Sequence, residues 1–130
     1  MTRDERTAIA RALADAEDGT TGRIGVRVIP DRDVDAFARA KREFVRAGLH
    51  RHAYENAVLI LVAPKARRFA IIGDRALHKE VGDAFWRDVV AHTEPYFARG
   101  AVLDGIVYAV GRAGNALRAH FPDAVQRETL

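Results

Sequence analysis

The sequence contains no cysteine, and this absence removes several kinds of chemistry at once. Without thiols there is no disulfide scaffold, thiolate zinc site, iron–sulfur cluster or cysteine nucleophile. Long apolar runs are also missing, since the longest, residues 57–64, falls far short of the roughly 20 residues that a membrane-spanning helix needs. Residues 1–16 carry charges where a signal peptide has an apolar core. We therefore expect a cytoplasmic protein that is not embedded in a membrane.

A large excess of one charge is absent as well. Lys and Arg number 21 against 18 for Asp and Glu, which gives a net charge of +3. Nucleic-acid binders usually concentrate cations on one face and offer aromatic rings for stacking, so we expect no nucleic-acid partner. The basic residues between positions 39 and 51 fit a solvated helix face, or contact with an anionic partner.

The 130 residues, 48% of them hydrophobic, fit one compact domain. We predict a single domain over residues 1–122 and a flexible tail over 123–130. Strands are expected near 23–29, 57–63 and 68–72. The first alternates apolar and polar residues, and the second is apolar on both faces, which is typical of a central strand. A helical crossover makes these two parallel, and the tight turn at Pro64 makes the third antiparallel.

Helical periodicity predicts about five helices, so the expected fold class is α/β, a three-layer α/β/α sandwich around a small mixed sheet. The helices are expected over residues 3–17, 33–47, 75–82, a segment ending before position 94, and 103–120. Thr2 and Glu5 form a capping-box pattern at the first helix. Leu59, Phe69 and Trp86 are expected in the core.

Two helices carry further expectations. Phe37, Ala40 and Phe44 define the apolar stripe of the second helix. Glycine weakens a helix, so the three glycines of the last helix are expected to let its backbone approach the sheet closely. They are Gly105, Gly111 and Gly114.

Two polar clusters have plain interpretations. The acidic segment 31–35 resembles a calcium loop, but Ala36 and Arg42 stand where such a loop needs glycine and glutamate. Helix capping is therefore favoured, with weak cation binding as the alternative. His50 and His52 lack a third metal donor nearby and are interpreted as surface or loop-packing residues. The sequence has no nucleophile elbow, phosphate-binding loop or dinucleotide fingerprint.

The predicted topology brings three separate polar segments to one edge of the sheet. Residues 17–23 precede or open the first strand, residues 55–56 precede the second, and residues 73–74 follow the third. Because the third strand is reversed, its end lies beside the beginnings of the other two.

Five short segments, taken in their order and spacing, resemble the TPM domain family. The most specific is Arg-Arg-Phe-Ala-Ile-Ile-Gly-Asp at 67–74, and the others lie at 16–24, 54–60, 85–86 and 117–122. The resemblance covers about residues 5–122. The family includes a thylakoid-lumen acid phosphatase linked to photosystem repair, a nematode receptor-associated protein and many bacterial proteins. It implies an α/β/α sandwich, divalent-cation binding of the calcium type in some members, and a modest phosphatase activity.

The resemblance also implies site residues. It places polar positions at Asp74 and Asn56, with Glu17 or Asp18 within reach as further ligands for calcium or magnesium. The helix that begins after Asp74 is expected to orient a phosphate at its N-terminus or to strengthen Asp74 as an acceptor. After the Thr-Thr-Gly turn the family commonly has Glu, whereas this sequence has Arg23, so a structural pair between Arg23 and Asp74 is the alternative to metal binding.

Two functions follow from the resemblance. The first is a non-catalytic or weakly active domain that binds a protein partner, in the maintenance of membrane proteins. The second is a divalent-cation-dependent hydrolase similar to acid phosphatases, in which a cation near Asp74 polarises a phosphate ester and activates water. The sequence offers this hydrolase no positioned nucleophile or histidine base, and the first function is favoured.

Overall fold

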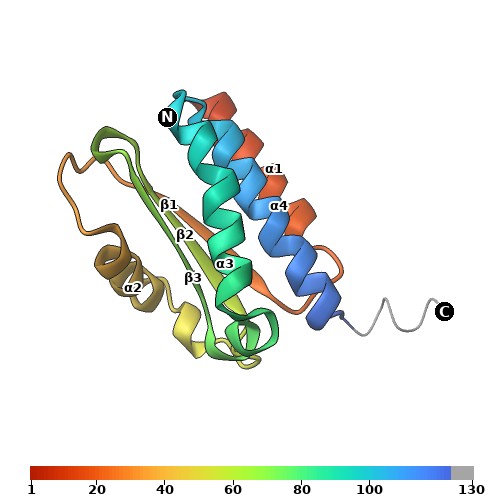
Figure 1. The fold of residues 1–130 in the computed structure, drawn as a ribbon. Helices are drawn as coiled ribbons and strands as arrows, with labels where there is room; N and C mark the ends of the chain where they lie inside the picture. Colours follow the sequence, from red (N-terminus) through yellow and green to blue (C-terminus); the bar gives the residue numbers. More distant parts are fainter. Residues whose placement is uncertain (124–130) are drawn as a thin grey trace.

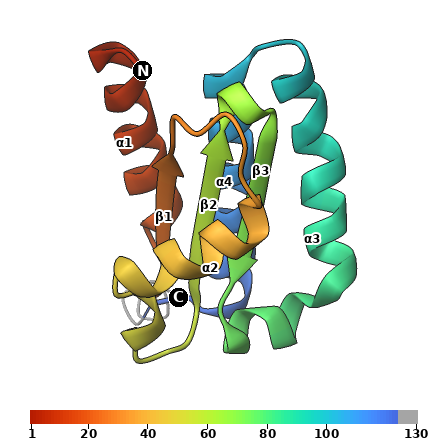
Figure 2. The same ribbon diagram turned by 90° about the vertical axis from the view of Figure 1, so that its left-hand side faces the viewer.

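A computed structural model describes residues 1–123, which form three layers (Figures 1 and 2). The sheet contains β1 (Arg23–Val28), β2 (Ala57–Ala63) and β3 (Arg68–Gly73), in that order. One face is covered by α1 (Arg3–Glu17), α3 (Arg75–Ala98) and α4 (Val102–His120), and the other by α2 (Ala36–Arg46). β1 runs parallel to β2, and β3 runs antiparallel to it. The predicted α/β/α sandwich with a mixed sheet is confirmed.

The chain returns after α4 to the turn between α1 and β1. Asp123 N–H donates to the Gly19 carbonyl at 3.1 Å, and Pro122 forms an isolated bridge with Thr20. The rest of the predicted tail, residues 124–130, lies outside the described residues. Over residues 1–123, no helix combines the length and the hydropathy that crossing a membrane requires.

Strand β2 is buried along its whole length and separates two hydrophobic clusters. Alternate strand residues point to opposite faces. Val58, Ile60 and Val62 therefore pack beneath α1, α3 and α4, whereas Leu59 and Leu61 pack beneath α2. Each such side chain contributes about 1.5–3 kcal/mol when it leaves water completely. The strand thus holds both helical layers to the sheet.

The three side chains expected in the core lie at different depths. Leu59 is fully buried in the cluster beneath α2. Phe69 and Trp86 are half-buried and pack against the other cluster. The Phe69 ring meets the Phe97 ring edge to face, with the centroids 4.8 Å apart.

Helix α1 begins with the predicted capping box. The Thr2 hydroxyl accepts a hydrogen bond from Glu5 N–H at 3.1 Å, and the Glu5 carboxylate accepts one from Thr2 N–H at 3.0 Å. The bond from the Thr2 backbone stabilises the ionised carboxylate and lowers the pKa of Glu5.

Helix α2 differs from its prediction in its start and its inner face. It begins at Ala36, and Asp35 caps it by accepting from Ala38 N–H at 3.1 Å, so the start at residue 33 was wrong. Phe37 is 55% exposed instead of lying on the buried stripe. The buried face carries Ala36, Ala40, Glu43 and Phe44.

Glu43 lies on this inner face because arginines surround its carboxylate. It pairs with Arg39 and Arg46 at 3.4 Å each and lies 3.9 Å from Arg27. A buried carboxylate needs such charge-assisted partners.

Residues 1–123 contain four α-helices rather than about five, because α3 joins two that were expected separately. Gly82 interrupts it with a left-handed φ of 75° and forms a kink at the expected boundary. The predicted end before Pro95 was wrong, since the helix continues to Ala98. Beyond Pro95, the Phe97 ring packs on Phe69 and the Tyr96 ring lies 5.6 Å from that of Tyr108. These contacts favour helix despite the lost backbone donor.

Two of the three glycines of α4 face neighbouring helices instead of the sheet, and the third faces open space. A β-carbon placed on Gly114 would lie 2.7 Å from the Ala16 side chain and 2.9 Å from the Ala16 carbonyl, so α1 and α4 approach here at backbone distance. One on Gly105 would meet the Phe97 ring at 2.5 Å, whereas one on Gly111 would meet nothing within 4 Å. The expectation that these glycines approach the sheet was therefore wrong.

This difference predicts opposite effects of alanine on stability. Gly111→Ala should raise the free energy of unfolding by about 0.5–1 kcal/mol, because alanine favours helix and the space is open. Gly114→Ala should lower it by about 1–3 kcal/mol, because the new methyl group collides with the α1 backbone. Urea unfolding of both variants and the wild type provides the measurement. A stabilised Gly114→Ala would contradict the close α1–α4 contact.

Candidate functional site

The three polar segments meet at one edge of the sheet, as the topology predicted. β1 begins beside β2, with Arg23 opposite Ala57, and β3 ends there, with Gly73 opposite Val58. Asp74 N–H donates to the Ala57 carbonyl at 2.8 Å, which extends the ladder by one bond. Asn56 and Asp74 therefore flank the neighbouring strands β2 and β3 at the same end of the sheet. We call this region the Asn56–Asp74 edge.

Two buried oxygen atoms at this edge have no hydrogen-bond partner within the described part of the chain. Asn56 is fully buried, and its amide nitrogen donates to Thr21 Oγ1 at 3.0 Å, but its Oδ1 is unpaired. Asp74 Oδ1 accepts from Arg75 N–H at 2.8 Å, but its Oδ2 is buried and unpaired. Buried polar atoms nearly always have partners, and each exception costs about 1–3 kcal/mol. Both atoms are acceptors, so a donor or a cation would satisfy them.

The amino end of α3 is already satisfied within the protein. The Asp74 carboxylate accepts a hydrogen bond from Arg75 N–H. The Glu55 carbonyl accepts hydrogen bonds from the N–H groups of Ala76 at 3.0 Å and Leu77 at 3.4 Å. Glu55 reaches this position with a left-handed φ of 52°. A phosphate needs free N–H groups at a helix terminus, and these three are used. The expectation that this terminus orients a phosphate is wrong for the arrangement seen here.

Two threonines fix the turn that faces Asn56. The Thr20 hydroxyl donates to the Phe121 carbonyl at 2.6 Å, with the Leu117 carbonyl at 3.2 Å, and accepts from Gly22 N–H at 3.1 Å. Thr21 N–H also donates to Phe121, at 3.1 Å. The turn is thereby tied to the end of α4.

The loop before β2 holds the same turn from the other side. His52 Nε2 lies 2.8 Å from the Thr21 carbonyl, so the imidazole donates there. This contact agrees with the interpretation of His52 as a loop-packing residue, although the sequence did not reveal its partner. The Thr-Thr-Gly run is the signal that could have directed attention to the turn.

The other predicted ligands have different environments. Glu17 is half-buried and its Oε2 accepts from Ile24 N–H at 2.7 Å, which anchors the start of β1. Asp18 is exposed and ends α1. Within residues 1–123, no ion pair joins Arg23 to Asp74, and Arg23 is exposed.

Trp86 lies at this edge as well as in the core. A β-carbon on Gly73 would lie 2.3 Å from the Trp86 ring, so only glycine fits between β3 and the indole. The indole N–H donates to His78 Nδ1 at 3.1 Å, and His78 Nε2 lies 3.2 Å from the Asp83 carboxylate. Both nitrogens of this imidazole are engaged. His78 and Trp86 lie on opposite sides of the kink at Gly82, so helical spacing alone does not identify this chain of contacts.

The edge has the chemistry of a weak oxygen-donor site. Hard cations take carboxylate, amide and carbonyl oxygens, and magnesium in particular uses one or two carboxylates and keeps several waters. Asn56 and Asp74 provide such oxygens, and they fit a divalent cation of this kind. Across residues 1–123, however, no three His, Cys, Asp or Glu side chains gather as a metal-binding group. With one carboxylate, the site would bind less tightly than a cage of several acids.

Comparison with known proteins shows the family and the fold of the chain. The TPM domain model matches residues 1–116. The structure of BA42 from the psychrophilic bacterium Bizionia argentinensis is 34% identical, with a TM-score of 0.85, over 94% of this chain and 84% of that one. The N-terminal domain of cg2496 from Corynebacterium glutamicum is 15% identical, with a TM-score of 0.69, over 90% of this chain and 74% of that one, and supports the fold alone. No protein with a curated function matches the sequence.

The Thr20 contacts predict how the turn responds to losing its hydroxyl. Thr20→Val keeps the shape but leaves two carbonyls and one N–H without this partner, so the free energy of unfolding should fall by about 1–3 kcal/mol. Thr20→Ser keeps the hydroxyl and loses one methyl group, so its loss should stay near about 0.8 kcal/mol. Chemical denaturation measures both. If the two variants were equally stable, the hydrogen bonds would not hold the turn.

Proposed function

Since the chain belongs to the TPM domain family, we propose that it acts by binding: it holds a divalent cation at the Asn56–Asp74 edge and binds a protein partner elsewhere on its surface. Catalysis of phosphate-ester hydrolysis is not part of this proposal. A setting in membrane-protein maintenance and a cytoplasmic location remain predictions.

The proposal rests on two buried oxygen atoms that have no hydrogen-bond partner within residues 1–123. Asn56 Oδ1 and Asp74 Oδ2 belong to residues that flank neighbouring strands, and both atoms are acceptors that lack a donor in the described residues. A calcium or magnesium ion would be held by these two atoms together with water, and it would supply positive charge that neutralises the Asp74 carboxylate. The cost of burying both oxygens would then be offset by coordination.

Three observations favour binding over hydrolysis. The sequence has neither serine nor cysteine, which excludes the commonest nucleophiles. The first N–H groups of α3 are occupied by Asp74 and by the Glu55 carbonyl, so they do not stabilise phosphate oxygens. His78 has both ring nitrogens engaged, by Trp86 and Asp83, and this leaves no free imidazole there for proton transfer.

Thermal unfolding with calcium or magnesium tests the cation site. A ligand at 100 times its dissociation constant should stabilise the wild type by about 2.7 kcal/mol, and a chelator should reverse the rise in Tm. Asp74→Asn should abolish the rise, because it removes the only carboxylate among the two ligands. Asparagine still caps the helix, so the Tm without cation should change little.

Asp15→Asn serves as the matched control. Asp15 is an exposed acid in the last turn of α1 that is not among the predicted ligands, and its replacement should leave the cation-dependent rise intact. Fluorescence of Trp86, the single tryptophan of the chain, gives a second readout because the indole packs against Gly73. The absence of any rise in the wild type, or an equal loss in both variants, would contradict a cation at Asp74.

Hydrolysis of a generic aryl phosphate in the same samples tests the proposal that the domain does not catalyse phosphate-ester hydrolysis. Turnover should be no greater for the wild type than for Asp74→Asn, with or without cation. Wild-type turnover that requires the cation and disappears in Asp74→Asn would instead establish the hydrolase.

A further inference from the structure

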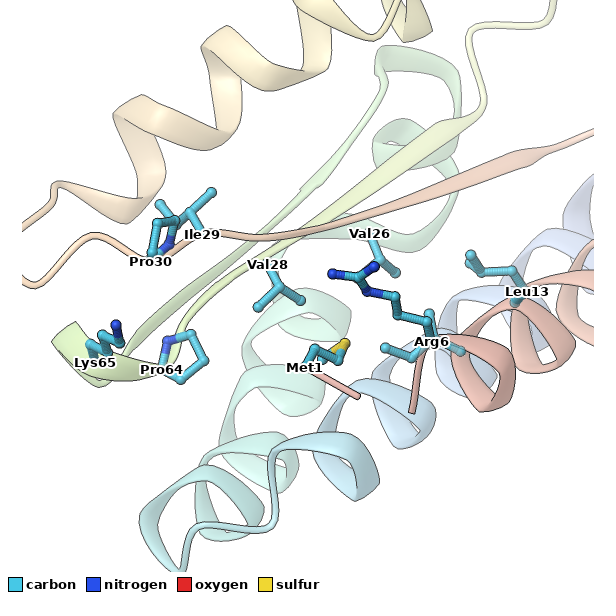
Figure 3. A pocket seen from close by; sticks show the side chains of 11 residues that line it. Met1, Arg6, Leu13, Val26, Val28, Ile29, Pro30, Pro64 and Lys65 are labelled. Carbon is cyan, nitrogen blue, oxygen red and sulfur yellow. The ribbon is translucent and has the colours of Figure 1, made fainter. Parts of the chain in front are cut away.

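A groove of about 670 Å³ lies between the amino half of α1 and the carboxyl end of β1 (Figure 3). Its floor is formed by Val26 and Val28, and its walls by Ile9 and Leu13 of α1 and by Pro64 beyond β2. Val28 is 38% exposed although it is an apolar strand residue. Contiguous exposed apolar surface beside a sheet edge often marks an interaction site.

The backbone of β1 is open along this groove. β1 is an edge strand, and the N–H of Ile29, the residue that follows it, donates inward to the Val62 carbonyl at 2.9 Å. Because successive strand residues alternate, the N–H groups of Ile24, Val26 and Val28 point outward. Glu17 accepts the N–H of Ile24 at 2.7 Å, which confirms that direction.

The other two outward-pointing N–H groups, those of Val26 and Val28, lie beside the groove. Among the described residues, no partner is recorded for the N–H of Val26 or Val28. The Val26 carbonyl has only a long contact of 3.4 Å from the Arg27 guanidinium. Such a row of open donors and acceptors is a template for an added strand.

The charge of the groove has one sign. Arg6 and Lys65 are its charged lining side chains, and no acidic side chain lines it. In Figure 3 the Arg6 side chain extends from α1 toward Val26 and Val28, and Lys65 lies near Pro64. Neither cation forms an ion pair within residues 1–123. The groove is therefore complementary to carboxylates.

We propose that this groove binds an extended acidic segment of a partner protein, which adds a strand to the free edge of β1. Main-chain hydrogen bonds to Val26 and Val28 give affinity, apolar side chains enter the groove at every second position, and carboxylates face Arg6 and Lys65. The inference rests on the proposed role in binding a protein, but it does not depend on the cation at the Asn56–Asp74 edge.

A second copy of this chain is a poorer occupant. Edge-to-edge pairing of two β1 strands would place the same cations, Arg6 and Lys65, on both sides of one interface. Like charges brought together across such an edge are destabilising. An acidic partner removes this repulsion.

A synthetic probe tests the proposal on the full chain. The probe is a fluorescein-labelled peptide of about eight residues that alternates glutamate and valine, a length suited to one strand. Fluorescence anisotropy should show saturable binding, and the lysine–valine analogue should bind at least about tenfold more weakly. The double variant Arg6→Glu with Lys65→Glu should lose a similar factor for the glutamate–valine peptide. Arg11→Glu, an exposed reversal on α1 outside the groove, should stay within about twofold of the wild type.

Backbone pairing has its own test. The glutamate–valine peptide with N-methylated valines keeps its charges and side chains but loses donors, so it should bind at least about tenfold more weakly. Amide exchange at Val26 and Val28 should slow in the complex with the unmodified peptide. Equal binding of the methylated peptide would overturn strand addition, and so would unchanged binding by the charge-reversed double variant.

The outcome is separable from that of the cation site. Peptide titrations are repeated with calcium and with chelator, and with Asp74→Asn. The groove predicts the same peptide affinity, within about twofold, in all of these conditions. No binding by the wild type would overturn the groove even if calcium raised the Tm, and peptide binding without any calcium effect would overturn only the cation site.

Discussion

Strand β2 must pair every backbone N–H and C=O along Ala57–Ala63, because both of its faces are buried and water cannot reach them. β1 satisfies one side and β3 the other. Since β1 is parallel and β3 antiparallel, this requirement brings the start of β1, the start of β2 and the end of β3 to a single edge. The location of Asn56 beside Asp74 is a consequence of pairing the central strand.

At the same edge, polar groups from three segments divide into those that satisfy the protein's own backbone and those that stay unpaired within residues 1–123. The Glu55 carbonyl and Asp74 Oδ1 satisfy the first turn of α3, and Thr20 satisfies the end of α4. Within residues 1–123, Asn56 Oδ1 and Asp74 Oδ2 are left over as acceptors. The first N–H groups of α3 are thus used inside the protein, whereas the two unpaired oxygens are the acceptors on which the proposed cation site rests.

β1 runs between the two proposed sites, and its outer edge differs at its two ends. At its amino end, Glu17 takes the outward N–H of Ile24, and the Thr20–Thr21 turn is tied to Phe121. At its carboxyl end, Val26 and Val28 face a groove whose cations, Arg6 and Lys65, form no ion pair within residues 1–123. Edge strands are normally blunted against association. Here one half of the edge is closed by a carboxylate, while the other half stays available to a partner.

Local chemistry in the sequence determined the strands, their directions, the capping box at Thr2 and the convergence of the polar segments, because periodicity and short connections act over a few residues. Tertiary structure decided the rest. Contacts of Phe97 with Phe69 favour the continuation of α3 past Pro95, and the arginines around Glu43 allow a carboxylate on the inner face of α2 while Phe37 is exposed. The unpaired oxygens depend on which atoms meet across 35 residues at Thr21 and Asn56 and across 101 residues at Thr20 and Phe121. A hydrogen-bond partner that distant is set only when the chain has folded, so no local pattern could show which acceptors would be left without one.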